Sequence, residues 1–166
     1  ILPRLLDMGV EPFLIASTVH TVIGQRLVRR VGKSKETYES TPAETAAIHA
    51  ALGGLLPKDA ETMAAVAENL GYKSLPLATD SAYTLTKGKD TPEAPGGYKG
   101  RMGVYEVFDV SEAIQDLILK RSTSSEIQAQ AESEGMVTMR QDGFLKALAG
   151  LTTVQEINRV ASADSA

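Results

Sequence analysis

The sequence has 166 residues, which is enough for one ordinary domain or two small subdomains. Hydrophobic residues make up 43% and charged residues 23%, as in soluble globular proteins, so the chain can build an apolar core. A net charge of −4 argues against extensive nucleic-acid binding, and the absence of cysteine excludes disulfides and thiolate metal sites. No apolar run approaches the roughly 20 residues that a membrane-spanning helix needs.

The first part of the chain predicts two short helices and a strand. Leucines at helical spacing predict a helix over residues 1–8, which Gly9 ends. Residues 13–19 predict a second helix, and the β-branched residues within 22–31 favour a strand. Because the sequence begins inside a predicted helix, we expect it to be a piece of a longer protein.

The middle of the chain predicts a small helical and extended region. Residues 32–40 are polar and predict a loop, after which Thr41 and Glu44 form a capping box that begins a helix. A second helix is expected over residues 60–70, so that the two form a helical hairpin. The remaining expectations are a short strand over 82–86, a loop over 87–97 and an extended segment over 98–107.

The last third of the chain predicts four helices, because four cap signals follow one another. They are Ser111, Thr123 with Glu126, Thr138 with Gln141, and Thr152 with Gln155. Each cap stabilises its helix by roughly 1 kcal/mol. We therefore expect a helical bundle at this end, a frayed tail over 162–166, and an α+β fold that is mostly helical.

The tripeptide Gly32-Lys33-Ser34 has the ending of a phosphate-binding loop, but the rest of that motif is missing. The full motif needs a glycine five positions earlier, where this chain has Leu27 within a predicted strand. A basic loop is the preferred interpretation. The two histidines, His20 and His49, lie on separate elements and predict no metal site.

Two polar segments are candidates for a functional contact. They contain Gln25, Arg26 and Arg29 in the first, and Lys99, Arg101 and Glu106 in the second. In the second segment, glycines at 100 and 103 are compatible with a shaped site for a subunit contact or an anion, and equally with a tight bend in a strand. The cations of the first segment fit an interface or the solvated face of a strand.

Several motifs, in this order, resemble the secretion ATPase superfamily of type II secretion and type IV pilus assembly. They are RLLDMGVEPFLIAS (4–17), QRLVR (25–29), GYKGRMGVYEV (97–107), EGM (134–136), MRQDG (139–143) and AGLTT (149–153). The resemblance covers most of the chain except roughly residues 40–80. It implies that a RecA-like ATPase core, with the phosphate-binding loop, precedes this region in the parent protein.

The resemblance also implies a division of the chain. Residues 1–31 would be the C-terminal edge of the RecA-like core, 32–97 an insertion, and 98–161 a strand with the C-terminal helical subdomain. ATP and Mg²⁺ would bind the parent protein, and this segment alone would not turn over ATP. Arg26, Arg29 and Arg101 are then plausible interface cations, because guanidinium groups pair with carboxylates in bidentate fashion.

Family members usually bind zinc through a pair of C-x2-C motifs, whose positions correspond here to Gly32, Lys35, Asp90 and Glu93. None of these residues is cysteine, and two carboxylates alone make a poor zinc site. We therefore expect no zinc, with the helical hairpin of the insertion as the structural substitute.

The resemblance implies a homo-hexamer that is cytoplasmic, lies at the inner face of the cell membrane and moves an inner-membrane platform protein. Its partners would be the missing ATPase core of the same chain and that platform protein, without nucleic acid. An assembly motor is favoured over a retraction motor, since retraction motors generally lack the insertion. The alternative is a helical protein-binding module with no ATPase role.

Overall fold

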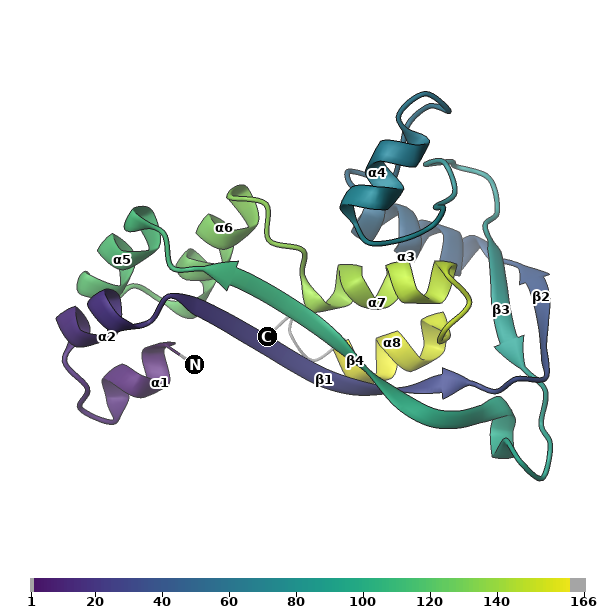
Figure 1. The fold of residues 1–166 in the computed structure, drawn as a ribbon, viewed down its shortest axis with the longest axis horizontal. Helices are drawn as coiled ribbons and strands as arrows, with labels where there is room; N and C mark the ends of the chain where they lie inside the picture. Colours follow the sequence, from purple (N-terminus) through teal and green to yellow (C-terminus); the bar gives the residue numbers. More distant parts are fainter. Residues whose placement is uncertain (1, 162–166) are drawn as a thin grey trace. The chain divides into compact units, whose positions relative to one another are not determined.

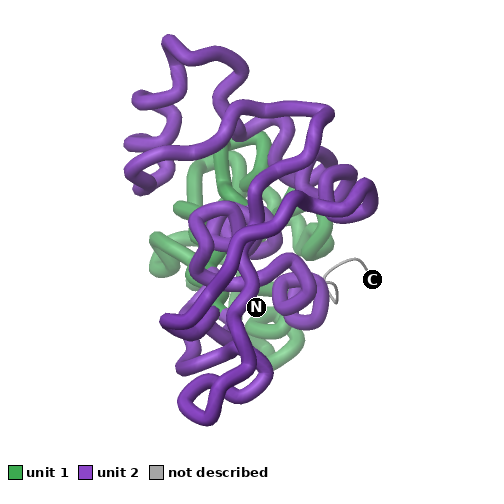
Figure 2. The backbone as a smooth tube through the Cα atoms, turned by 90° about the vertical axis from the view of Figure 1, so that its right-hand side faces the viewer, with its two compact units in different colours: residues 1–25, 105–138 green, residues 26–104, 139–166 purple. Residues whose placement is uncertain are grey.

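A computed structural model describes residues 2–161 as a mixture of helices and two small sheets (Figure 1), which confirms the α+β class. The chain forms two compact units, which Figure 2 colours separately. Unit 1 comprises the residues up to 25 together with 105–138, and unit 2 comprises 26–104 together with the residues from 139 onward. The chain thus passes from unit 1 to unit 2, back to unit 1, and again to unit 2.

Unit 1 combines four short helices with the adjoining parts of two long strands. These elements are α1 (Leu2–Asp7), α2 (Pro12–Thr18), α5 (Glu112–Leu119), α6 (Ser124–Ser133), β1 (Thr21–Val31) and β4 (Tyr98–Asp109). The hydroxyls of Ser111 and Thr123 accept hydrogen bonds from the backbone N–H groups of Ile114 and Glu126, which confirms both predicted caps. The helices bury their apolar faces in one core that includes Ile15 and Ile114.

Unit 2 contains the other parts of β1 and β4, a second sheet and four α-helices. Its further elements are β2 (Lys35–Glu39), α3 (Pro42–Leu52), α4 (Met63–Asn69), β3 (Thr84–Gly88), the 3-10 helix η1 (Pro95–Gly97), α7 (Met139–Leu148) and α8 (Val154–Ala161). β2 and β3 pair antiparallel, with Lys35 opposite Gly88. Val28 of β1 and Val104 of β4 are fully buried in a cluster with Ile157 of α8.

The longer sheet consists of β1 and β4 alone among the described residues. In unit 1 the N–H of Val110 donates to the carbonyl oxygen of His20 at 2.8 Å, and in unit 2 the N–H of Gly32 donates to that of Gly97 at 2.9 Å. Exposed and less exposed side chains alternate over residues 21–28. This alternation confirms the predicted strand.

The predicted loop over residues 32–40 is wrong, because most of it forms β2. Its sequence, KETYE, shows no apolar alternation, but β3 supplies hydrogen-bonding partners along its whole length. The hydroxyl of Tyr38 also donates to Glu44 Oε1 at 2.9 Å. Tertiary pairing therefore overrides a weak local preference.

The starts of α3 and α4 differ in how well they follow the prediction. The capping box of Thr41 and Glu44 is present as expected. The second helix was expected from Ala60 but α4 begins at Met63. The cause is Asp59, whose carboxylate accepts hydrogen bonds from the N–H and hydroxyl of the N-cap residue of α4, both at 2.8 Å, and so forms a turn before the helix.

The last four helices form two pairs in different units, where one bundle was expected. α5 packs with α6 in unit 1, and α7 packs with α8 in unit 2. The side chains explain the division, since Ile127 of α6 enters the core of unit 1 and Met139 of α7 enters the cluster around Val28. Within residues 2–161, every helix is too short or too polar to cross a lipid bilayer.

Candidate functional site

The six residues singled out in the sequence lie on the two long strands, divided between the units. Gln25 and Glu106 belong to unit 1, and Arg26, Arg29, Lys99 and Arg101 belong to unit 2. Arg26 donates to the carbonyl oxygen of Val160 at 2.5 Å, which ties β1 to the end of α8. Arg29 joins a polar cluster around Glu156, a residue that the sequence analysis had not singled out.

Glu106 is half-buried in unit 1. A β-carbon on Gly24 would lie 2.9 Å from Glu106 Cγ, so the glycine leaves room for this side chain. Glu106 also lines a cavity of about 160 Å³ together with the apolar residues Phe108, Ile127 and Met136. Gln25, Lys99 and Arg101 are exposed.

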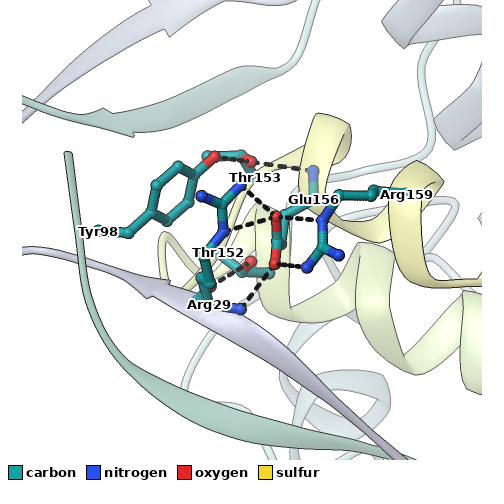
Figure 3. Close-up of polar contacts among 6 residues, drawn as sticks. All are labelled: Arg29, Tyr98, Thr152, Thr153, Glu156 and Arg159. Atoms are coloured by element: carbon teal, nitrogen blue, oxygen red, sulfur yellow. Dashed lines mark hydrogen bonds and ion pairs between the residues drawn. The ribbon is translucent and has the colours of Figure 1, made fainter. Parts of the chain in front are cut away.

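The polar cluster of unit 2 is centred on the carboxylate of Glu156, whose side chain is fully buried on α8 (Figure 3). Glu156 Oε2 accepts hydrogen bonds from Arg29 Nε at 3.0 Å and Arg29 Nη2 at 2.7 Å. Arg159, one helical turn later, donates from Nη2 to Oε1 at 2.5 Å and from Nε to Oε2 at 3.1 Å. One buried carboxylate therefore holds two guanidinium groups, each about half exposed.

The same cluster closes the outer edge of β1 in unit 2. The backbone N–H of Arg29 donates to Glu156 Oε1 at 3.0 Å, and its carbonyl accepts from the hydroxyl of Thr152 at 2.9 Å. The N–H of Val31 donates to the carbonyl of Leu151 at 3.0 Å. Residues 151–156 thus satisfy the strand edge as a neighbouring strand would.

Tyr98 and Thr153 complete the cluster, and Thr153 corrects the predicted cap of α8. The guanidinium carbon of Arg29 lies 4.2 Å from the centre of the Tyr98 ring, and the Tyr98 hydroxyl lies 2.7 Å from Thr153 Oγ1. Thr153, and not the expected Thr152, caps α8 by accepting from the N–H of Glu156 at 3.2 Å. The spacing Thr153-x-x-Glu156 also fits a capping box, and this signal could have located Glu156.

The electrostatics indicate a structural contact that is charged at neutral pH. Burial would raise the pKa of Glu156, but hydrogen bonds from Arg159 and Arg29 outweigh burial and hold its pKa at about 2, below the ordinary 4.5. A carboxyl group of this kind stays ionised near neutral pH and is unsuited to proton transfer there. The cluster therefore fixes α8 on β1, with a Tyr98 ring stacked on Arg29.

The four positions at which the resemblance placed zinc ligands hold residues that do not fit zinc. Lys35 Nζ donates to the carbonyl of Gly150 at 3.2 Å, and Asp90 Oδ1 accepts from the N–H of Gly96 at 2.9 Å. A glycine and a lysine donor replace two thiolates, and zinc prefers nitrogen and sulfur ligands. Within residues 2–161 no group of three or more metal-binding side chains comes together.

The backbones of Gly88 and Gly97 make an unusually close contact. A β-carbon on Gly88 would lie 1.8 Å from the carbonyl oxygen of Gly97, and one on Gly97 would lie 2.4 Å from that of Gly88. A β-carbon on Gly32 would meet that of Ala94 at 2.8 Å. The end of β3 and the turn before β4 are therefore held together by direct backbone packing, which only glycine permits.

Gly32-Lys33-Ser34 connects β1 to β2. A phosphate-binding loop needs a helix N-terminus after it, and β2 follows here instead. This geometry confirms the interpretation of the tripeptide as a basic loop.

The family described as type II/IV secretion system protein matches residues 1–159 of the chain. The type IV pilus assembly ATPase PilB of Pseudomonas aeruginosa is 32% identical over 159 residues, which are 96% of this chain and 24% of that protein. The type II secretion system protein E of Xanthomonas campestris pv. campestris is 32% identical over 158 residues, which are 95% of this chain and 24% of that protein. The PilB of Thermus thermophilus is 34% identical over 155 residues, 93% of this chain and 15% of that protein. The chain therefore spans about a quarter of these relatives' length, or less.

Proposed function

The chain belongs to the type II/IV secretion system protein family, and from this membership we propose that it is the C-terminal segment of an ATPase that powers type IV pilus assembly or type II secretion. In this proposal residues 1–31 are the edge of a RecA-like core, 32–97 an insertion without zinc, and 98–161 a strand and helical subdomain. ATP and Mg²⁺ bind elsewhere in the longer parent protein. The names of the relatives support a role in type IV pilus assembly or type II secretion, and their greater length supports a longer parent protein.

The distribution of exposed apolar side chains is the observation that carries the proposal. Among the described residues, eight large apolar side chains are exposed, and seven of them lie in unit 1, which is the smaller unit. The seven are Met8, Phe13, Leu14, Ile23, Tyr105, Val107 and Leu119. Concentrated apolar exposure marks a surface that contacts another protein or another part of the same protein. The missing ATPase core is the occupant that family membership suggests.

The two long strands provide further support. In unit 2 the outer edge of β1 is closed by residues 151–156. In unit 1, β1 and β4 pair only with each other among the described strands. Strands beside exposed apolar side chains are suited to continue into a larger sheet. Unit 1 therefore has the properties expected of the edge of a larger domain.

The role that follows is mechanical. The segment packs on the ATPase core, helps to set contacts in a homo-hexamer and transmits nucleotide-driven motion to an inner-membrane platform protein from the cytoplasmic side. Nucleic acid has no part in this role.

ATP turnover tests the proposal when this segment is compared with the parent protein under identical conditions. We expect turnover by the parent and none by the segment.

A second experiment changes Ile23 and Val107 to serine. These changes should leave the stability of the segment within about 0.5 kcal/mol, because both side chains are exposed, and should lower the melting temperature of the parent.

Turnover by the segment alone would contradict the proposal. A parent sequence without a G-x4-G-K-[ST] loop would instead favour the helical protein-binding module.

A further inference from the structure

Four cations of unit 2 whose side chains have no partner among the described residues lie on the two long strands or in the turn after β1. Arg30 lies near the end of β1, Lys33 lies in the turn after it, and Lys99 and Arg101 lie near the start of β4. A 2.9 Å backbone hydrogen bond joins this turn to the start of β4, so the four residues gather at one end of the sheet. All four are exposed. We call these four residues the basic end.

Two nearby cations of the same unit, in contrast, are paired with carboxylates. Arg29 is paired with Glu156, and Lys87 lies 3.1 Å from Glu36. Residues 26–35 and 98–104 contain no aspartate or glutamate. The positive charge of the basic end is therefore uncompensated on the strands that carry it, and it favours contact with an anionic surface.

Unit 1 has the complementary charge. Residues 1–25 and 105–138 contain nine acidic residues and three cations, a net charge of −6. Four of the acids are exposed and have side chains without a partner in the described part of unit 1: Asp7, Glu11, Glu112 and Asp116. They lie on α1, directly before α2 and on α5, and α2 packs against both of the other helices. We call these four residues the acidic face.

We propose that the basic end of one copy of the chain contacts the acidic face of a neighbouring copy. A contact between two different surfaces of identical chains is head to tail, and repetition of such a contact closes a ring when the rotation permits. Pairing of guanidinium and ammonium groups with carboxylates sets partner orientation and association rate more than affinity. The proposal rests on the proposed hexamer and names the surfaces that meet within it.

Charge reversal in the full-length parent protein tests this contact, with assembly followed by sedimentation at 50 and 500 mM salt. The basic variant is R30E/K99E/R101E and the acidic variant is D7K/E112K/D116K. Each triple variant should weaken assembly at least tenfold at low salt. The variant that carries all six substitutions should assemble as well as the wild type. High salt should weaken assembly of the wild-type protein and narrow the difference between it and the variants, because exposed charges are screened.

A matched control reverses Lys58 and Lys73, which are exposed cations of the insertion, and should leave assembly unchanged. The inference is overturned if either triple variant assembles as well as the wild type. It is also overturned if both triple variants remain folded and the variant with all six substitutions does not regain assembly. ATP binding by each variant is measured in parallel. Failure of the wild-type parent to bind ATP would contradict the proposed function itself, whereas normal ATP binding with unchanged assembly would contradict only this inference.

Discussion

The two units are stabilised in different ways. Unit 2 closes its long strand with polar groups, through the carboxylate of Glu156 and the hydroxyl of Thr152, and packs the backbones of Gly88 and Gly97 against each other. Unit 1 is held mainly by apolar helix packing around Ile114 and leaves seven large apolar side chains exposed. Polar contacts that close a strand edge are therefore found in unit 2, and most of the exposed large apolar side chains are found in unit 1.

Removal of the Glu156 carboxylate should cause the largest loss of stability, and it tests how unit 2 is held together. Glu156→Ala leaves the N–H of Arg29 and two guanidinium groups without their acceptor, and we expect a loss of about 4 kcal/mol in the free energy of unfolding. Urea unfolding of the chain measures the loss. Glu93→Ala, at an exposed position, is the control and should change stability by less than about 0.5 kcal/mol. A loss below about 1 kcal/mol for Glu156→Ala would show that the cluster does not hold α8 on β1.

Disruption of the contact between Gly88 and Gly97 should lower stability almost as much. A methyl group on Gly88 would lie 1.8 Å from the carbonyl oxygen of Gly97, so Gly88→Ala forces the backbones apart, and we expect a loss of about 3 kcal/mol. Gly54→Ala is the matched control, because nothing lies within 4 Å of its added methyl group. A chelator should leave the melting temperature of the wild-type chain unchanged. A drop in melting temperature on adding the chelator would contradict a metal-free contact. Equal stability of the two variants would contradict the close packing of Gly88 against Gly97.

The sequence was more informative about local features than about contacts between distant segments. The capping boxes at Thr41 and Thr123 were predictable, because each depends on residues three positions apart. β2 was not predictable, since its stability comes from a partner strand about 50 residues away. Arg29 was identified as a candidate on its own strand, but its partner Glu156 lies 127 residues later, and no local pattern joins the two.

The third prediction concerns acid. The pKa of Glu156 is about 2 in the folded chain against an ordinary value of 4.5, so its contribution is complete above about pH 5 and is lost as the pH falls toward 2. The shift corresponds to about 3 kcal/mol. Stability of the wild type and of Glu156→Gln, measured between pH 7 and pH 2.5, should therefore converge as the pH falls. Parallel curves would show that Glu156 does not titrate as the geometry implies.

The smallest predicted loss of stability comes from a capping box, a motif that occurs in both units. Glu44 and Glu126 each complete a capping box, with the carboxylate accepting from a threonine N–H at 2.9 Å and 2.7 Å. Glu44 also accepts from the Tyr38 hydroxyl at 2.9 Å and from Gln155 Nε2 at 2.8 Å, whereas Glu126 is exposed on α6. We expect Glu44→Ala to cost about 2 kcal/mol and Glu126→Ala to cost clearly less, because the first change also removes the acceptor of two part-buried donors.

Equal losses in the two variants would mean that the longer-range bonds of Glu44 add nothing to a local cap. A larger loss for Glu44→Ala would show that the same motif is local in unit 1 and joins β2, α3 and α8 in unit 2. Restoration of stability in Glu44→Gln, which keeps an acceptor at this position, would assign the difference to hydrogen bonding. Failure of Glu44→Gln to recover would assign it to the charge.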